Sequence, residues 1–179
     1  MLFRDGDHRA FDEIVNRYSD RIFSFTKRFL VDEALAEDAT QETFIKIWKH
    51  KKSFDDNRSF TPWIFQIARN TALDMLRKRK DFSFSQMSAV DDSRFEEGIE
   101  DETISLADDF DTSVLHTALE KTLEVLSPDQ RSVVLLHDVE GLTFEEIGET
   151  MAKPMNTVKS HYRRAILALR KRLTENGFV

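Results

Sequence analysis

The sequence predicts an all-α protein in which two small helical domains are joined by an acidic linker. Long stretches carry apolar residues three and four positions apart, which is the spacing of one helix face. Five glycines and three prolines among 179 residues supply few turns, which disfavours an all-β domain. Residues 81–112 hold eleven acidic residues and one basic residue. The net charge of this segment is therefore −10, more negative than the −7 of the whole chain. We therefore assign residues 1–82 and 113–179 to the domains and residues 83–112 to a flexible linker.

The first domain is expected to contain three long helices. Residues 8–31 place their apolar side chains on one stripe. A second helix runs from about Glu33 to His50, with Ile45 among the side chains that face inward at least in part. The third begins at Thr61-Pro62, a helix cap followed by proline at the first helical position, and ends in the basic run 77–80.

Two capping boxes mark the helices of the second domain. Ser127 and Gln130 flank a proline at the first helical position, and Thr143 and Glu146 follow Gly141, a typical helix stop. A short helix, a four-residue break and a second helix make a helix-turn-helix. The predicted helices of this domain span about 113–126, 128–140, 143–151 and 156–174.

The last predicted helix has an apolar face and a basic face. Its apolar residues from Val158 to Leu173, Ile166 among them, recur at helical spacing and are expected to pack on the domain. Residues 153–172 contain seven Lys and Arg residues and no acidic one, a charge that attracts phosphates. In a helix-turn-helix, the N-terminal half of this helix enters the major groove. A solvated basic surface helix is the alternative, which the helix-turn-helix spacing disfavours.

The loop 53–60 and the helix that follows it form a second candidate nucleic-acid surface. Aromatic side chains beside positive charge suit stacking on unpaired bases. Core packing is the more common role of any single aromatic residue, and a basic helix end also complements the helix dipole. We nevertheless expect at least one or two of four aromatic side chains to be exposed: Phe54, Phe60, Trp63 and Phe65.

The composition argues against several other classes of function. The chain has no cysteine, its five histidines are far apart, and it contains neither a glycine-rich phosphate loop nor a nucleophile elbow. We therefore expect no metal, no cofactor, no small-molecule substrate and no enzymatic activity. No apolar run approaches the ~18 residues of a membrane span, and charges interrupt the N-terminus where a signal peptide is apolar, so we expect a cytoplasmic protein.

Three motifs follow one another along the chain. Residues 36–50 read AEDATQETFIKIWKH, residues 59–80 contain a Trp, an Ile-Ala and an Asn-Thr-Ala, and residues 141–165 contain a Thr-Val-Lys-Ser core. They resemble, over nearly the whole length, the extracytoplasmic-function (ECF) subfamily of bacterial sigma factors. The matching features of that family are an acidic-Gln-Glu-aromatic-Trp helix, a promoter-melting helix and a C-terminal helix-turn-helix. One such motif is a weak signal, whereas all three in this order are specific.

The resemblance implies a sigma factor that binds core RNA polymerase and directs it to promoter DNA, under the control of an anti-sigma factor that is often membrane-anchored. The contacts with the helical clamp of the polymerase's largest subunit would fall on Asp38, Gln41, Glu42, Phe44 and Trp48. The −10 contacts, with the loop 53–60 receiving a flipped base of the non-template strand, would fall on Phe54, Asn57, Arg58, Phe60, Trp63, Asn70, Arg77 and Arg79. The −35 contacts would fall on Thr157, Lys159, Ser160, His161, Arg163 and Arg164.

The chain departs from the family at a few positions. Gln66 and His161 stand where arginine is common, and Ala152 and Asn156 occupy turn positions where glycine is usual. Asn tolerates such backbone geometry, so the turn is expected to form.

An alternative reading is a stand-alone helix-turn-helix regulator whose N-terminal helices dimerise or sense a ligand. It predicts symmetric dimers on palindromic sites, without polymerase. A reader of duplex DNA has no use for a base-capture loop, which favours the sigma factor. The sequence leaves open how the two domains are arranged.

Overall fold

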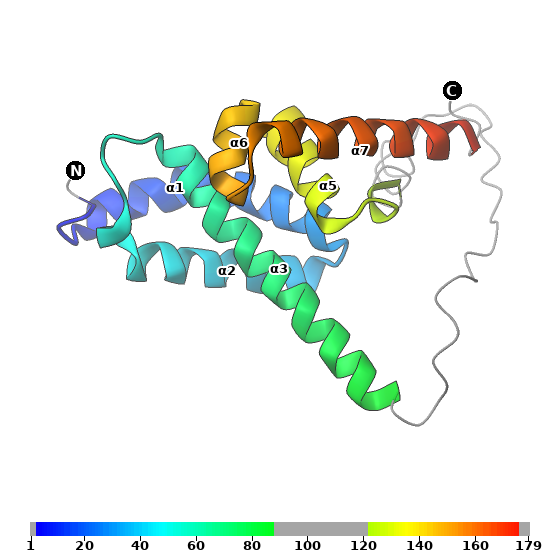
Figure 1. Ribbon diagram of the computed structural model, residues 1–179. Coiled ribbons are helices and arrows are strands. Elements are labelled where there is room, and N and C mark those ends of the chain that lie inside the picture. Colours follow the sequence, from blue (N-terminus) through cyan, green and yellow to red (C-terminus); the bar gives the residue numbers. More distant parts are fainter. Residues whose placement is uncertain (1–2, 88–121, 176–179) are drawn as a thin grey trace, which may run out of the picture.

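All regular elements are helices in the residues that the computed structural model describes, which are 3–87 and 122–175 (Figure 1). The all-α prediction is therefore confirmed. Most of the predicted linker and of the expected helix 113–126 lie outside the described residues. The elements of the first domain are α1 (His8–Leu30), α2 (Glu33–Lys49), the short 3-10 helix η1 (Lys51–Ser53) and α3 (Phe60–Met87). Those of the second are α5 (Pro128–Val134), the π-helical segment η2 (Leu135–Val139), α6 (Phe144–Met151) and α7 (Met155–Glu175).

Short polar side chains fix the starts of α1 and α2. The carboxylate of Asp7 accepts a hydrogen bond from the backbone N–H of Arg9, and that of Asp32 accepts one from Leu35. Between the two helices, Val31 adopts a left-handed conformation with a φ of 53°, which ends α1. The break between the helices therefore follows from local capping.

The first domain encloses an aromatic core. Phe25 stacks on Phe29 at a ring distance of 5.7 Å and meets Phe65 edge-on at 5.5 Å. These rings come from α1 and α3, so the core joins the two helices. Fully buried aliphatic side chains complete this core: Ile22, Ile47 and Ile64.

Helix α3 differs from its prediction at both ends. It begins at Phe60, and the hydroxyl of Thr61, which was expected to cap the helix, instead shares a hydrogen bond of 3.0 Å with the Tyr18 hydroxyl. Because Tyr18 is buried in α1, this bond holds the start of α3 against the core. The helix also continues past the basic run 77–80 to Met87. The run therefore lies within the helix, where it does not serve as a C-terminal complement to the dipole.

Both predicted capping boxes of the second domain are present. The backbone N–H of Thr143 donates to the Glu146 carboxylate at 2.9 Å, and the Thr143 hydroxyl accepts from the backbone N–H of Glu146 at 3.2 Å. Ser127 and Gln130 make the same pair of bonds before α5. Gly141 has a φ of 73° and lies in the break between η2 and α6, as its stop signal predicts.

The turn of the helix-turn-helix forms, although not as expected. Ala152 carries the left-handed conformation, with a φ of 51°, while Asn156 lies inside α7. A non-glycine residue in this conformation costs roughly 1–2 kcal/mol. Glycine is needed instead at Gly148, where an added Cβ would lie 2.9 Å from the carbonyl oxygen of Lys153. This close approach sets the tight angle between α6 and α7.

The buried face of α7 is shifted from the predicted one. Val158 and Ala165 are fully buried, whereas Ile166 is 39% exposed. The prediction that Ile166 packs on the domain is therefore wrong, because Ala165 occupies the contact position and Ile166, about 100° further round the helix, faces outward.

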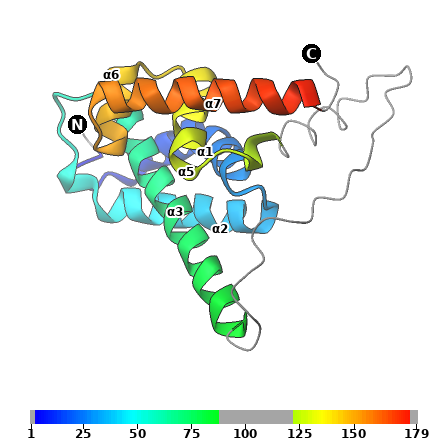
Figure 2. The ribbon, with the colours of Figure 1, turned by 45° about the vertical axis from the view of Figure 1, so that its right-hand side comes forward.

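The two domains pack against each other in the described structure. Helix α6 contacts α3, and α5 and η2 contact α1. In both ribbon views the second domain lies over α1 and α3, while α2 forms the opposite side of the first domain (Figures 1 and 2).

Candidate functional site

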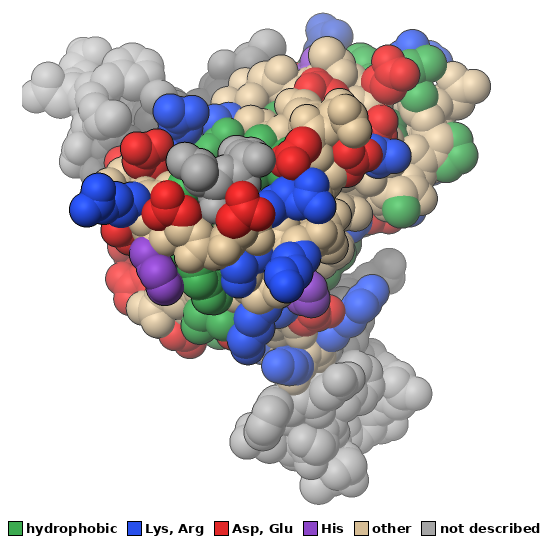
Figure 3. Space-filling view, turned by 90° about the vertical axis from the view of Figure 1, so that its left-hand side faces the viewer, with side chains coloured by type: hydrophobic (Ala, Val, Ile, Leu, Met, Phe, Trp, Pro, Cys, Tyr) green, Lys and Arg blue, Asp and Glu red, His purple; other side chains and the backbone are tan. Residues whose placement is uncertain are grey.

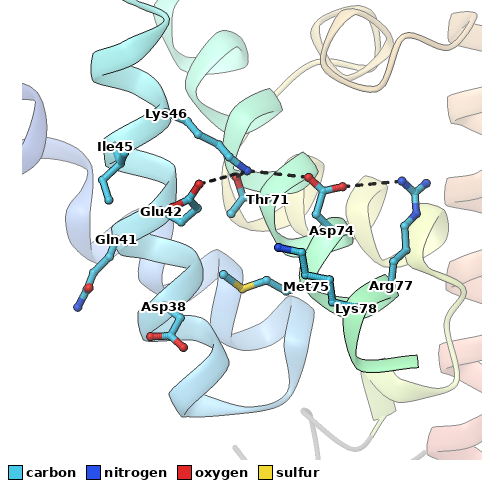
Figure 4. Close-up of a pocket in the computed structure, with 10 residues that line it drawn as sticks. All are labelled: Asp38, Gln41, Glu42, Ile45, Lys46, Thr71, Asp74, Met75, Arg77 and Lys78. Atoms are coloured by element: carbon cyan, nitrogen blue, oxygen red, sulfur yellow. Dashed lines mark hydrogen bonds and ion pairs between the residues drawn. The ribbon is translucent and has the colours of Figure 1, made fainter. Parts of the chain in front are cut away.

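A groove of about 600 Å³ lies between α2 and α3 (Figure 4). Lys46 reaches across it from α2, with its Nζ atom 3.8 Å from the Glu42 carboxylate and 3.9 Å from the Asp74 carboxylate. The same ammonium group donates to the Thr71 hydroxyl at 3.2 Å, so one lysine links the two helices. Three of the predicted polymerase-binding residues line this groove: Asp38, Gln41 and Glu42.

The other two predicted polymerase-binding residues face α1. The ring of Phe44 lies 6.5 Å from that of Phe11, and Trp48 lies 5.0 Å from Phe11 and stacks on His8. Ile45, expected to face inward, is 46% exposed and lines the groove instead. The structure therefore places the predicted polymerase-binding residues on two sides of α2, and it exposes Ile45, which was expected to face inward.

Aromatic rings back the loop 53–60. Phe54, Phe60 and Trp63 contact one another at ring distances of 4.9 to 5.6 Å. Phe54 is only 4% exposed, Phe65 is fully buried, and Phe60 and Trp63 are partly buried. The expectation that one or two of these aromatic side chains would be exposed is therefore wrong. The rings fold back on one another and on the buried Phe3, which removes more apolar surface from water than exposure would.

Polar groups form the exposed tip of this loop. The Asp55 carboxylate accepts two hydrogen bonds of 3.0 Å from Asn57, one from its backbone N–H and one from its side chain. These bonds lower the pKa of Asp55 below its ordinary value. Arg58 is exposed, 3.7 Å from the Asp55 carboxylate and 3.8 Å from that of Glu149 in α6. Figure 3, viewed from the left-hand side of Figure 1, shows Lys and Arg side chains gathered on one part of the surface, with acidic groups beside them.

Helix α3 presents three predicted −10 residues at exposed positions, Asn70 and Arg77 on one side of the helix and Arg79 on the opposite side. Asn70 is exposed, as are Arg77 and Arg79 further along the helix. The two arginines make open ion pairs, Arg77 with Asp74 at 3.8 Å and Arg79 with Asp32 at 3.4 Å. Exposed pairs of this kind contribute about 0–1 kcal/mol, so both guanidinium groups can exchange a carboxylate for another anion at little cost.

Helix α7 presents the predicted −35 residues along its first half. Ser160 donates its hydroxyl to the carbonyl oxygen of Asn156 at 2.9 Å, and His161 and Thr157 are partly buried. With α6 in front and a tight turn between, this half of α7 is the part of a helix-turn-helix that enters a major groove. The exposed members of the set are Lys159, Ser160, Arg163 and Arg164.

Buried arginines join the two domains. Arg69 of α3 is 6% exposed and donates to the Ser132 hydroxyl at 2.9 Å and to the Asp129 carboxylate at 2.6 Å. Arg131 of α5 donates to the carbonyl oxygens of Leu123 and Phe29, the latter at the C-terminal end of α1, where carbonyl groups lack partners within the helix. Sequence reasoning missed both arginines. The sequence offered one signal for their burial, which is that each arginine occurs in a helix among apolar residues.

Comparison with known proteins gives two family matches that together cover both domains. Residues 14–82 match the family model for Sigma-70 region 2, and residues 116–169 match that for Sigma-70 region 4. The chain is 31% identical to the ECF RNA polymerase sigma factor SigW of Bacillus subtilis over 174 residues, which covers 96% of this chain and 93% of that protein. The chain belongs to the ECF sigma factors. The ECF sigma-E factor of Escherichia coli is 34% identical to this sigma factor, covering 89% of this chain and 84% of that protein.

Two solved structures share the fold of this sigma factor. The structure of CnrH in complex with the cytosolic domain of CnrY has a TM-score of 0.72 at 21% identity, covering 97% of this chain and 94% of that one. The sigma factor RpoE in complex with the anti-sigma factor NepR from Bartonella quintana has a TM-score of 0.70 at 24% identity, covering 93% and 98% of the two chains.

The family assignment decides between the two readings of the sequence. The protein is a sigma factor, a subunit that binds core RNA polymerase and promoter DNA, and not a stand-alone regulator. Within residues 3–87 and 122–175, no helix combines the length and apolar character needed to cross a membrane. The same residues hold no group of three side chains suited to a metal ion.

The contact between the domains is expected to tighten as the pH falls from neutral toward 4.5, the ordinary pKa of a glutamate, because of Glu140. Burial raises the pKa of this carboxyl above its ordinary 4.5, although Arg21 hydrogen-bonds to it at 3.0 Å and both Arg21 and Arg28 favour the charged form. For a group whose pKa is raised, the contribution to stability is fully present below about pH 4.5 and is lost as the pH rises through the folded-state pKa.

The measurement is a label-to-label distance as a function of pH. Because the chain has no cysteine, Ala34→Cys on α2 and Lys171→Cys on α7 provide unique exposed attachment sites. A Glu140→Gln control should abolish this component of the pH dependence and keep the domains at least as firmly together at pH 7. A Glu140→Gln protein that separates at pH 7 would contradict the dominance of burial.

Proposed function

We propose that the three polar surfaces divide the work of initiation among them. The groove of α2 and α3 docks core RNA polymerase, the loop 53–60 and the side of α3 that carries Asn70 and Arg77 open and hold the −10 element, and the first half of α7 reads the −35 element. Residues 1–82 and 113–179 are the working domains and residues 83–112 connect them. The protein has no catalysis of its own.

The observation that carries this proposal is the position of Asn70. Its amide is exposed on α3, on the same side of the helix as Arg77 two turns further along, whereas Arg79 lies on the opposite side, where it pairs with Asp32. An amide can hydrogen-bond the Watson–Crick edge of an unpaired base, while arginines bind the phosphates beside it. Since Phe54 is buried, it supports the loop rather than stacking on a base.

The α2 side of the groove supports polymerase docking. Asp38 and Gln41 are exposed, and Gln41 points away from α3 (Figure 4). Glu42 is held by Lys46, and Ile45 supplies exposed apolar surface between them. A helix that presents an exposed apolar residue together with carboxylates fits a basic amphipathic helix on the partner. Phe44 and Trp48 keep the helix in place from its other side.

Control by an anti-sigma factor belongs to the same proposal. The solved relatives CnrH and RpoE were each determined in complex with a partner, CnrY and the anti-sigma factor NepR. We expect a protein of this kind to bind both domains of this chain and to hold it in the cytoplasm, at the membrane if the partner is anchored there.

Substituting Asn70→Ala should impair strand opening more than formation of the closed complex. Loss of a specific base contact costs about 1–3 kcal/mol, so we expect roughly a tenfold loss of opening. Core polymerase and the sigma factor are mixed with a promoter selected from a random DNA library. Permanganate reactivity of unpaired thymines measures opening, and a gel shift measures total binding.

The matched control is Asn16→Ala, the same change at an exposed position on α1. It should leave both measurements unchanged. Thymine reactivity that stays at the wild-type level with Asn70→Ala would remove Asn70 from the site, and failure to obtain any promoter from the library would overturn the proposed division of work as a whole.

A further inference from the structure

A network of charges around the buried Arg69 holds the second domain on α3. Asp129, at the start of α5, places one carboxylate oxygen 2.6 Å from Nη2 of Arg69 and the other 2.9 Å from Nζ of Lys153. The Nε atom of Arg69 donates to the Ser132 hydroxyl, which itself donates to the carbonyl oxygen of Pro128 at 2.8 Å. The guanidinium group is therefore engaged along one edge by two acceptors from the other domain.

This network lies at the predicted DNA face of α3. Arg69 directly precedes Asn70, and its Nη1 atom donates to the Asn70 side-chain oxygen at 3.5 Å. A groove of about 770 Å³ runs from Asn70 and Arg77 to Asp129 and Lys153. Two carboxylates line this groove: Asp74 lies 3.8 Å from Arg77 on α3 itself, and Asp129 is the anion that faces Arg69 and Lys153 from the second domain. Burial alone would raise the pKa of Asp129, but the Lys153 hydrogen bond and the charges of Lys153 and Arg69 hold it below its ordinary value.

The second domain also reaches the loop 53–60. Glu149 of α6 lies 3.8 Å from Arg58, and the Thr150 hydroxyl donates to the carbonyl oxygen of Pro62 at 3.4 Å. A pocket of about 440 Å³ beside the loop takes Glu149 and Thr150 as one of its walls. In this arrangement a nucleic-acid strand that followed α3 from Asn70 to the loop would meet α5 and α6.

A carboxylate and a phosphate make the same planar, two-bonded contact with a guanidinium group. We propose that the packed arrangement is self-inhibiting, with Asp129 occupying on Arg69 the place that a DNA backbone phosphate takes once the domains separate. Arg69 is then a further DNA-binding residue of the −10 surface, an inference that rests on the function proposed above for α3. The second domain screens this surface until an interaction with both domains draws them apart.

The proposal is tested by two substitutions that should both separate the domains but that differ in whether Arg69 remains to bind DNA. Asp129→Asn and Arg69→Gln both break the ion pair, so each should separate the domains. Only Asp129→Asn leaves Arg69 free to bind phosphate. The control is Glu145→Gln, which removes one exposed negative charge from the first turn of α6, as Asp129→Asn does from the first turn of α5.

Domain separation is measured first, in the free protein. Labels at Ala34→Cys and Lys171→Cys should give a short, narrow distance distribution in the wild type and in Glu145→Gln. Both Asp129→Asn and Arg69→Gln should add a longer and broader component, with helical circular dichroism kept. A wild-type protein that is already separated, or unchanged distances in both variants, would overturn the self-inhibition.

DNA binding is measured next, by fluorescence anisotropy with a labelled single strand of about 20 nucleotides and mixed sequence. Asp129→Asn should bind roughly five-fold more tightly than the wild type or better. Adding Arg69→Gln should abolish that gain and lower the slope of log affinity against log salt by about 0.7, the value for one phosphate contact on a single strand.

The outcomes separate the two proposals. If the domains separate but Arg69→Gln changes neither affinity nor slope, Arg69 does not bind DNA and the phosphate exchange is wrong. If the Arg69 result holds while Asn70→Ala leaves strand opening intact, the fault lies in the base contact proposed for Asn70.

Discussion

Joining the two domains covalently is expected to reduce promoter-dependent transcription by about 10²–10⁴-fold, the gain that simultaneous engagement of two linked sites normally supplies. The proposed locking pair is Arg21→Cys with Glu140→Cys, joined by a crosslinker that contains a reducible bond. These residues face each other across the domain contact, with Arg21 Nη2 at 2.9 Å from the Glu140 carboxylate, and neither belongs to a proposed DNA or polymerase surface.

The reason is a mismatch of lengths. The −10 and −35 elements are named for positions roughly 25 base pairs apart, which at ~3.4 Å per base pair separates them by about 85 Å. A compact protein of 179 residues has a radius of gyration of only about 16 Å. With α6 packed on α3, the −10 and −35 surfaces lie on one such body. The 34 residues between Met87 and Thr122 can reach about 110 Å when fully extended, at ~3.3 Å per residue, so the connection permits separation.

Reduction of the crosslinker supplies the internal control. The same sample should regain transcription after reductant, and the two substitutions without crosslinker should transcribe at nearly the wild-type level. Full transcription by the locked protein would show that the packed arrangement is itself competent.

Truncating the central core ring, Phe25→Ala, should lower the free energy of unfolding of the first domain by about 3–5 kcal/mol. Phe25 is buried between Phe29 and Phe65, so its loss leaves a cavity between α1 and α3. A domain of this size is stable by only about 5–15 kcal/mol, so this one change removes a large share of its stability.

Urea denaturation followed by tryptophan fluorescence measures the effect. Both tryptophans of the chain, Trp48 and Trp63, lie in the first domain, so the signal reports on that domain alone. The matched control is Phe23→Ala, two positions earlier on α1, where the ring is only partly buried and the loss should be clearly smaller. Equal losses at the two positions would contradict the packing of this core.

Local signals explain which helix boundaries could be predicted. The capping boxes at Ser127 and Thr143 and the positive φ of Gly141 depend on residues within one turn of each other, and all three agree with the structure. Thr61 shows the limit of such signals. Its hydroxyl has the chemistry of a cap, but a buried Tyr18 from another helix competes for it. Capping cannot be read from sequence where a tertiary partner offers a second hydrogen bond.

Side-chain exposure was predicted less well than helical structure. Ile45 and Ile166 share helical spacing with core residues, yet both are exposed. Phe54 lies in a polar loop, yet it is buried. The spacing of apolar residues locates the buried face of a helix only to within about one side chain. Which of two adjacent apolar residues is buried depends on the surface against which the helix packs.

The sequence by itself determined the helices, the two-domain order, the helix-turn-helix and, through three motifs, the sigma factor family. These depend on periodicity, capping and residue identity, which are properties of short segments. Only the tertiary structure decided that Arg69 is buried against Asp129 and that the second domain covers part of the −10 surface. That contact joins residues 60 positions apart across two domains, and no local pattern records which carboxylate a buried arginine will find.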